Sequence, residues 1–290
     1  MSVHNLIFNL INANSRPSTY ASSLLYNTIQ RREPCMIARF GSNEIKAVLY
    51  PLAPKFVQRC FQKRLFYNME TGAGFFPATD EMIQKFSRLM IEDMKYLDIL
   101  GSWRIEERLL TKYTPTAKRV TLPLLEPYLS QDPWSKALEG RNVLVIHPFA
   151  ETIQYQYENS RQQIFQDPRI LPEFASLRTI KAVQTIAGQK SSYKDWFEAL
   201  QAMKEEIDSV NFDIAILGCG AYGFPLAAHI KRLGRQAFHL GGPTQLLFGI
   251  KGKRWDNHPT ISKFYNNHWT RPNQKERPTD AAKVEGACYW

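Results

Sequence analysis

Three glycines in the last third of the chain have the spacing of a phosphate-binding turn. Gly218, Gly220 and Gly223 fit the pattern GxGxxG, with Ala221 and Tyr222 inside it, and they follow the apolar run 213–217. Between a strand and a helix, such glycines let backbone amides and a helix N-terminus approach a phosphate group. The pattern favours a phosphate-bearing ligand. The alternative is a tight turn that serves only helix packing.

A common dinucleotide site requires one more group than this motif supplies. That site has an acidic residue about 20 positions downstream, which binds a ribose hydroxyl. Here the corresponding positions are Phe238, His239 and Leu240, so a plain NAD site is not expected. Gly241 and Gly242 come next and would place a second glycine turn beside the first. Two adjacent glycine turns favour a nucleotide ligand.

A cation and a carboxylate flank another turn near the start of the chain. Arg39 ends an apolar run, and Gly41, Ser42, Asn43 and Glu44 follow it. An arginine at a strand end can bind phosphate oxygens with two parallel hydrogen bonds. A glutamate in the first turn of a helix can orient a hydroxyl or hold a metal ion, or it can simply stabilise the helix dipole. We interpret this turn as part of the ligand site.

Two further strand ends carry groups that could take part in chemistry. His147 follows the run 143–146, and Glu151 comes four residues later, which makes a histidine and glutamate pair for acid–base catalysis conceivable. A hydrogen-bonded spacer is the alternative role for His147. Trp103 and Arg104 follow the run 97–101, where they could stack on a base and contact phosphate, although Trp103 could equally lie in the core.

The intervening segments alternate between strand and helix patterns. Continuous apolar runs predict strands at 35–38, 97–101, 120–125, 143–146, 179–185, 213–217 and 236–240. Helical spacing predicts helices at 6–11, 19–31, 80–96, from 151, and at 193–207, with another that ends at Leu233. This alternation predicts an α/β fold with a mainly parallel twisted sheet, helices on both faces and a ligand site at the carboxyl ends of the strands.

Composition limits the organisation of the chain. With 290 residues and 44% apolar content, it can form one large domain. We expect a helical segment over 1–33, an α/β domain over 34–269 and a polar tail over 270–290 that frays or, less favoured, closes as a lid. No run is typical of a secretory signal, a transmembrane helix or a zinc site, so we expect a cytoplasmic protein.

The charge of the chain favours an anionic partner. The formal net charge is +10, and the segment from Arg31 to Arg64 alone has eight basic and two acidic residues. A nucleotide, an anionic membrane surface or a nucleic acid would each fit this charge. Because no RNA- or DNA-binding motif occurs, we expect no nucleic-acid partner. A non-catalytic protein that binds an anionic ligand remains an alternative.

Two of these regions resemble the GT-D-fold glycosyltransferases, a bacterial family. The segment from Arg39 to Glu44 is similar to the family's early Arg-Phe-Gly-Asp-Gly-Glu, and the block from Asp213 to Gly242 is similar to its final strand–glycine–helix–strand unit. Ser42 and Asn43 depart from this motif, because they stand where the family has aspartate and glycine. Glu44 is therefore the one acid left there, and metal dependence is in doubt.

The resemblance implies transfer of a sugar from a nucleotide donor, most often a UDP-sugar, to a glycan or a lipid-linked acceptor. For such a reaction, residue type and predicted strand-end position assign Arg39 and Arg104 to the diphosphate, the glycine turns to the nucleotide or sugar, and Glu44 to the role of base or ligand of Mn²⁺ or Mg²⁺. A lipid-linked acceptor would bring the protein into peripheral contact with a membrane. The rival enzyme class, a Rossmann-type methyltransferase or NAD-dependent enzyme, depends on the GxGxxG motif alone.

Overall fold

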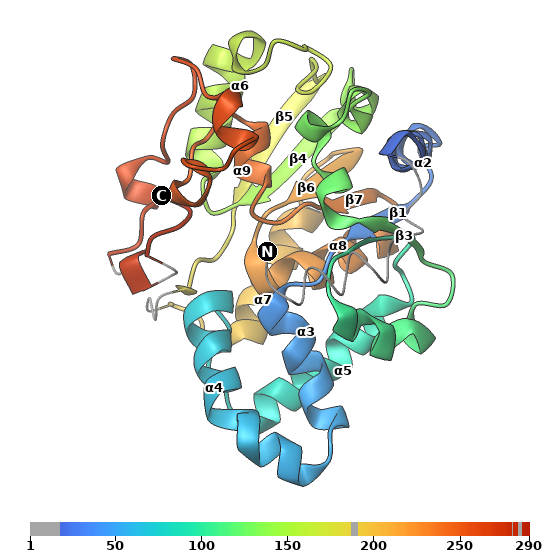
Figure 1. Ribbon diagram of the computed structural model, residues 1–290, viewed down its shortest axis with the longest axis vertical. Helices are drawn as coiled ribbons and strands as arrows, with labels where there is room; N and C mark the ends of the chain where they lie inside the picture. The colour runs from blue at the N-terminus through green and yellow to red at the C-terminus, as the bar shows by residue number, and fades with distance from the viewer. Residues whose placement is uncertain (1–17, 187–190, 280, 284–285) are drawn as a thin grey trace.

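The computed structural model describes residues 18–186, 191–279, 281–283 and 286–290, which form an α/β fold around one sheet (Figure 1). The helix expected at 6–11 lies outside the described residues. The strands are β1 Cys35–Ala38, β2 Ile99–Ser102, β3 Lys118–Thr121, β4 Asn142–His147, β5 Ser176–Lys181, β6 Ile214–Leu217 and β7 Gln236–His239. The α-helices are α2 Ser18–Gln30, α3 Ser42–Leu49, α4 Lys55–Ala73, α5 Asp80–Met94, α6 Ala150–Ile164, α7 Trp196–Asp208, α8 Gly223–Arg232 and α9 Thr244–Leu247.

All strand pairs in the sheet are parallel, in the order β3-β2-β1-β7-β6-β4-β5. Strands β2 and β3 extend the sheet on one side of β1, and the four later strands lie on its other side. The strand order therefore changes direction at β1 and β7, where Ile37 pairs with Phe238. Ligands of open parallel sheets bind beside such a change, outside the carboxyl ends of the strands.

The central strands are apolar throughout because both faces of the sheet are covered. Met36, Leu144 and Ala215 face one core, with α3, α4, α5, α7 and α8. Val143 and Ile216 face the other, with α2 and α6. Figure 1 shows these two groups of helices on opposite sides of the sheet. The predicted α/β class and parallel sheet are confirmed.

Three parts of the chain differ from the sequence expectation. The strand expected at 120–125 ends at Thr121, and Leu122–Leu125 form a 3-10 helix. Residues 55–73 form the 19-residue helix α4, which the pattern did not indicate. The tail, expected to fray, packs in its described part against the rest of the protein, where Glu276 and Trp290 are buried. Glu276 accepts hydrogen bonds from the backbone N–H groups of Glu151 and Thr152, so the tail supplies a carboxylate to the N-terminus of α6.

The helices that the structure describes include none that is long and apolar enough to span a bilayer.

Candidate functional site

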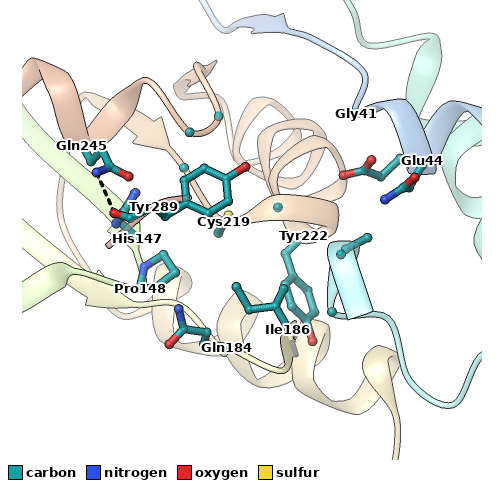
Figure 2. A pocket seen from close by; sticks show the side chains of 18 of the residues that line it. Gly41, Glu44, His147, Pro148, Gln184, Ile186, Cys219, Tyr222, Gln245 and Tyr289 are labelled. Atoms are coloured by element: carbon teal, nitrogen blue, oxygen red, sulfur yellow. Dashed lines mark hydrogen bonds between the residues drawn. The ribbon is translucent and has the colours of Figure 1, made fainter. Parts of the chain in front are cut away.

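A cavity of about 230 Å³ opens at the carboxyl ends of the strands (Figure 2). The residues after β1, β2, β4, β6 and β7 all contribute to it, as expected, and those after β5 do as well. Of the expected site residues, those that line it are Arg39, Gly41, Ser42, Asn43, Glu44, Trp103, His147, Gly218, Gly220, Tyr222, Gly241 and Gly242. The sheet thus brings together groups that lie up to about two hundred positions apart in the sequence.

Arg39 is the cation that extends from β1 into this cavity. Its guanidinium lies 5.2 Å from the centroid of the Trp103 ring, and Trp103 Nε1 donates a 2.8 Å hydrogen bond to the Phe40 carbonyl. Burial lowers the pKa of Arg39, and the charge of Glu44 opposes this shift. Among the described residues, the buried Arg39 Nε has no hydrogen-bond partner. A buried donor on a charged group is costly unless an acceptor reaches it.

Glu44 lines the same cavity from the first turn of α3. Its carboxylate folds back onto the helix N-terminus and accepts hydrogen bonds from the backbone of Asn43 and of Glu44 itself. Burial raises the pKa of Glu44, while these hydrogen bonds and Arg39 lower it. The expected helix-stabilising role is therefore present, and the carboxylate faces the cavity as well.

Gly41 makes this arrangement of Glu44 possible. Gly41 is the N-cap of α3 and has ordinary extended backbone angles, so its small size is what matters. A β-carbon at this position would lie 1.8 Å from Glu44 Oε2.

His147 and Glu151 do not form the expected pair. His147 is the last residue of β4, and α6 begins only at Ala150, so the four-residue spacing does not place both side chains on one helix face. Glu151 is exposed, lies outside the cavity and pairs with Lys181 at 3.6 Å. Burial lowers the pKa of His147 to about 3, and its Nδ1 accepts a 2.9 Å hydrogen bond from the Phe149 N–H. The neutral ring therefore carries its proton on Nε2, which suits a hydrogen-bond donor better than a base.

Trp103 and Arg104 also differ in their position relative to the cavity. Trp103 lines the cavity, whereas Arg104 does not. Arg104 Nη2 pairs with Glu106 Oε1 at 2.6 Å. Its assignment to the diphosphate, which followed from its position after β2, is therefore not supported by the geometry.

Each glycine of the GxGxxG motif has a steric reason to lack a side chain. A β-carbon on Gly218 would lie 2.5 Å from His147 Cδ2, and one on Gly223 would lie 2.2 Å from His239 Nε2. Gly220 has a left-handed backbone with φ of +57°. Gly223 and Ala221 do not line the cavity. The glycines therefore serve packing, while the first part of the turn also borders the ligand space.

Three backbone amides of this turn already have protein partners. The N–H groups of Gly218, Tyr222 and Gly223 donate to the carbonyls of Ile146, Cys219 and Gly220. These three amides are thus not available to a phosphate group, in contrast to the expectation for residues 218–223. Arg39 is therefore a stronger candidate for binding an anion than these three amides are.

The second glycine turn borders the cavity together with the end of the chain. Gly241 has φ of +78°, and a β-carbon there would lie 3.1 Å from Arg39 Nη1. The Tyr289 ring lies against Gly242, and its carbonyl accepts a 3.1 Å hydrogen bond from Gln245 Nε2, the contact marked in Figure 2. Arg254 lines the same wall, with its guanidinium 4.8 Å from the Tyr289 ring centroid.

A second cavity of about 240 Å³ adjoins the first. Arg39, Trp103, Arg254 and Tyr289 line both, and Glu126 lines only the second. Burial raises the pKa of Glu126 to about 7, although Tyr128 donates a 2.6 Å hydrogen bond to its carboxylate. The charge of Arg39 thus acts on one carboxylate in each cavity, Glu44 and Glu126.

Sequence reasoning missed several residues that line the main cavity. Those named by neither motif include Gly74, Thr185, His239, Gln245, Arg254 and Tyr289. His239 does lie in an expected strand, one residue before its end, which was a usable signal. Gln245 lies in the four-residue helix α9, and Arg254 and Tyr289 lie in short turns of the chain, so none of the three has a periodic pattern.

The donor set fits Mn²⁺ or Mg²⁺ poorly. Hard divalent cations prefer several oxygen ligands, whereas Glu44 is the one carboxylate among the lining residues. Its oxygens already accept backbone hydrogen bonds. The described residues contain no group of three or more side chains suited to holding a metal ion.

Comparison of the chain with protein-family models, with curated proteins and with solved structures gave no match.

Proposed function

We propose that the protein is a glycosyltransferase that binds a nucleotide sugar in the cavity at the carboxyl ends of β1, β6 and β7. The observation that carries the proposal is Arg39, a partly buried cation at the change of strand order whose buried Nε is without a partner among the described residues. A diphosphate supplies the acceptor oxygens that this guanidinium requires. The resemblance of residues 39–44 to the GT-D motif adds to this support.

In the proposed reaction, an acceptor hydroxyl attacks the anomeric carbon of the donor sugar. The new carbon–oxygen bond forms as the bond to the diphosphate oxygen breaks, and the nucleoside diphosphate leaves with the bonding electrons. Arg39 stabilises the negative charge that develops on this leaving group. The hydroxyl proton passes to a carboxylate, which acts as general base.

Glu44 is the proposed base, because it lines the same cavity as Arg39. Its raised pKa brings a carboxylate closer to the range in which a base works well near neutrality. His147 is a positioning group in this scheme, since its neutral ring can donate a hydrogen bond from Nε2 to the donor sugar or the acceptor.

The end of β7 disfavours the rival NAD-dependent enzyme. In a dinucleotide site, the strand beside the glycine turn ends in an acid that binds ribose. Here β7 pairs with β6 and ends in His239, whose pKa burial lowers to about 3. A neutral imidazole lacks the two acceptor oxygens that a ribose diol pairs with.

A thermal-shift screen tests the proposal. The ligands are UDP, GDP, CMP and their sugars, with and without Mn²⁺, together with NAD and S-adenosylmethionine. A ligand at 100 times its Kd adds about 2.7 kcal/mol to the free energy of unfolding, which gives a clear rise in Tm. We expect a rise with one nucleoside diphosphate, and release of that diphosphate from its sugar when acceptor is added. A rise with NAD or S-adenosylmethionine alone would assign the site to the rival class.

A further inference from the structure

Helix α4 carries three of the seven large apolar side chains that the described surface exposes, and a fourth lies just before it. Phe56, Phe61 and Tyr67 are 71%, 60% and 64% exposed, and Leu52 just before the helix is 51% exposed. The other three, Leu109, Tyr155 and Leu233, lie on separate elements. Folding does not require aromatic residues at exposed positions, and a cluster of them marks a binding surface.

Basic side chains lie between these aromatic residues. Lys55, Arg59, Lys63 and Arg64 are exposed, and residues 55–64 contain no acid. In the part of the chain that the structure describes, none of the four makes an ion pair; Lys55 donates a hydrogen bond to Gln58. The exposed face of the helix is therefore both apolar and strongly positive.

The opposite face fixes α4 to the protein. Gln58, Leu65, Met69 and Ala73 are buried, and the helix packs against α3. Residues 72–74 at its C-terminal end line the main cavity. In Figure 1, α4 lies at the outer edge of the molecule, on the side of the sheet opposite α6.

We propose that the exposed face of α4 docks on an anionic lipid bilayer. A bilayer surface offers negative headgroups for the four cations and, a few ångströms deeper, an apolar layer for Leu52, Phe56 and Phe61. A second copy of the chain fits less well, because a two-fold contact through this face would oppose four cations with four more. An acidic protein surface would pair with the charges but leave the phenylalanines without an apolar layer. A nucleic acid could stack its bases on the phenylalanines, but the sequence contains no RNA- or DNA-binding motif.

The docked helix is also the one whose C-terminal residues 72–74 line the cavity, so docking holds the site on the same bilayer that would carry a lipid-linked acceptor. The docking goes beyond the proposed sugar transfer and does not depend on it. Vesicle binding is measured without nucleotide, so failure of one proposal leaves the other intact.

The test is cosedimentation of the full chain with phosphatidylcholine vesicles, with and without phosphatidylglycerol. We expect binding only to the anionic vesicles, weakening as salt is raised. Neutralising Arg59, Lys63 and Arg64 to Gln lowers the affinity by about fivefold per residue. The double variant Phe56→Ser/Phe61→Ser lowers it by about tenfold or more.

Matched variants control for charge and hydrophobicity in general. Arg108→Gln/Lys112→Gln/Lys118→Gln removes the same charge elsewhere, and Leu109→Ser/Tyr155→Ser removes two other exposed apolar side chains; both should bind as the wild type does. Cys60 is the exposed cysteine of α4, whereas Cys35, Cys219 and Cys288 are buried. An environment-sensitive dye on Cys60 should therefore shift to the blue with anionic vesicles.

Three outcomes would overturn the proposal. One is equal binding to both kinds of vesicle, and another is an equal loss of binding in the control variants. The third is a dimer, seen by light scattering, that dissociates in the Phe56→Ser/Phe61→Ser variant, which would make a second copy the partner of this face. Because the substituted side chains are exposed, each variant should keep the wild-type Tm, which also serves as the folding check.

Discussion

The carboxylate of Glu44 lies against the α-carbon of Gly41, at a place that any larger residue would fill. A β-carbon on Gly41 would come within 1.8 Å of Oε2 and 2.3 Å of Oε1. Gly41→Ala should therefore turn the carboxylate out of the cavity without altering the backbone. We expect the variant to lose transfer activity to the same extent as Glu44→Gln, with a loss of about 1 kcal/mol in the free energy of unfolding as the helix loses its cap.

The double variant provides the decisive comparison. If Gly41 acts through Glu44, Gly41→Ala/Glu44→Gln should be no less active than either single variant in kcat/KM. Additive losses would mean that Gly41 has another role. Lys46→Ala, on the exposed side of α3 and outside the cavity, is the control for a general disturbance of α3.

Arg39 and Arg104 form a natural pair of test and control. Both guanidiniums lie 5.2 Å from the Trp103 ring centroid, but only Arg39 lines the cavity. Arg39→Gln should weaken binding of the nucleoside diphosphate by about tenfold or more, since a hydrogen bond to a charged group is worth about 1.5–3 kcal/mol. Arg104→Gln should change it by less than about twofold. Isothermal titration calorimetry measures both.

Arg39→Gln should weaken ligand binding but should not lower the stability of the ligand-free protein. Arg39 is a partly buried cation whose buried Nε has no partner among the described residues, so its removal relieves a cost in the ligand-free protein. We expect the Tm of Arg39→Gln to equal or exceed that of the wild type. A large decrease in Tm would mean that Arg39 mainly supports the fold.

The carboxyl group of Glu126 should leave a signature in the pH dependence of stability. Its pKa is raised from 4.5 to about 7 by burial, so the folded protein keeps the proton to a higher pH than the unfolded chain does. Stability relative to Glu126→Gln should therefore be greatest below pH 4.5, fall between pH 4.5 and 7, and be constant above. Because the side chain is partly exposed, we expect a total change of about 1–2 kcal/mol. Urea unfolding of both proteins across this range measures it; parallel curves would contradict the assignment.

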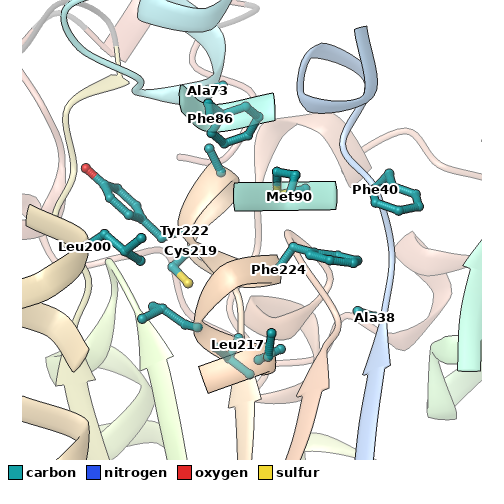
Figure 3. Close-up of a cluster of buried hydrophobic side chains, with 14 of the residues drawn as sticks. Ala38, Phe40, Ala73, Phe86, Met90, Leu200, Leu217, Cys219, Tyr222 and Phe224 are labelled. Carbon is teal, nitrogen blue, oxygen red and sulfur yellow. The ribbon is translucent and has the colours of Figure 1, made fainter. Parts of the chain in front are cut away.

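Gly223 tests the packing role of the GxGxxG motif. A β-carbon there would lie 2.2 Å from Nε2 of the buried His239 (Figure 3 shows the neighbouring core of Tyr222 and Phe224). Gly223→Ala should lower the free energy of unfolding by about 1–3 kcal/mol through overpacking. Gly234→Ala is the contrast. Its φ of +78° strains alanine, but no described atom lies within 4 Å of the β-carbon that alanine would add. It should cost about 1 kcal/mol. Gly223 has ordinary helical angles, with φ of −60°. A cost no greater than that of Gly234→Ala would therefore mean that His239 moves aside and relieves the crowding.

The parallel sheet could be predicted because its strands are buried on both faces. Val143, Leu144, Val145 and Ile146 are all inaccessible to solvent, so the strand appears in the sequence as an unbroken apolar run. Helix α4 has the opposite character. Phe56 and Phe61 lie on its exposed side, and this placement obscures the helical period by which the other helices were predicted.

The site was predictable only where it follows the ends of strands. Arg39, Glu44, His147 and Gly218 follow predicted strands, and the rule for parallel sheets placed them at one edge. Arg254 and Tyr289 reach the cavity from turns whose position depends on tertiary contacts, such as the hydrogen bond of the Arg254 N–H with the Cys288 carbonyl. The pairing of Glu151 with His147 was wrong because Glu151 lies outside the cavity and pairs with Lys181.

The position of β7 constrains the order in which the protein can assemble. This strand is the last of the sheet in the sequence, yet it lies between β1 and β6, where Cys35 and Ile214 both pair with Gln236. Pairing β1 with β7 closes the loop formed by residues 39–235. Closing this loop is slow, because the chain loses conformational entropy before the two strands gain any contact. While the ribosome is still synthesising the chain, the turn with Arg39 and the turn with Gly218 have no strand to join them. The nascent protein therefore cannot contain the cavity until residues 236–239 have emerged and inserted.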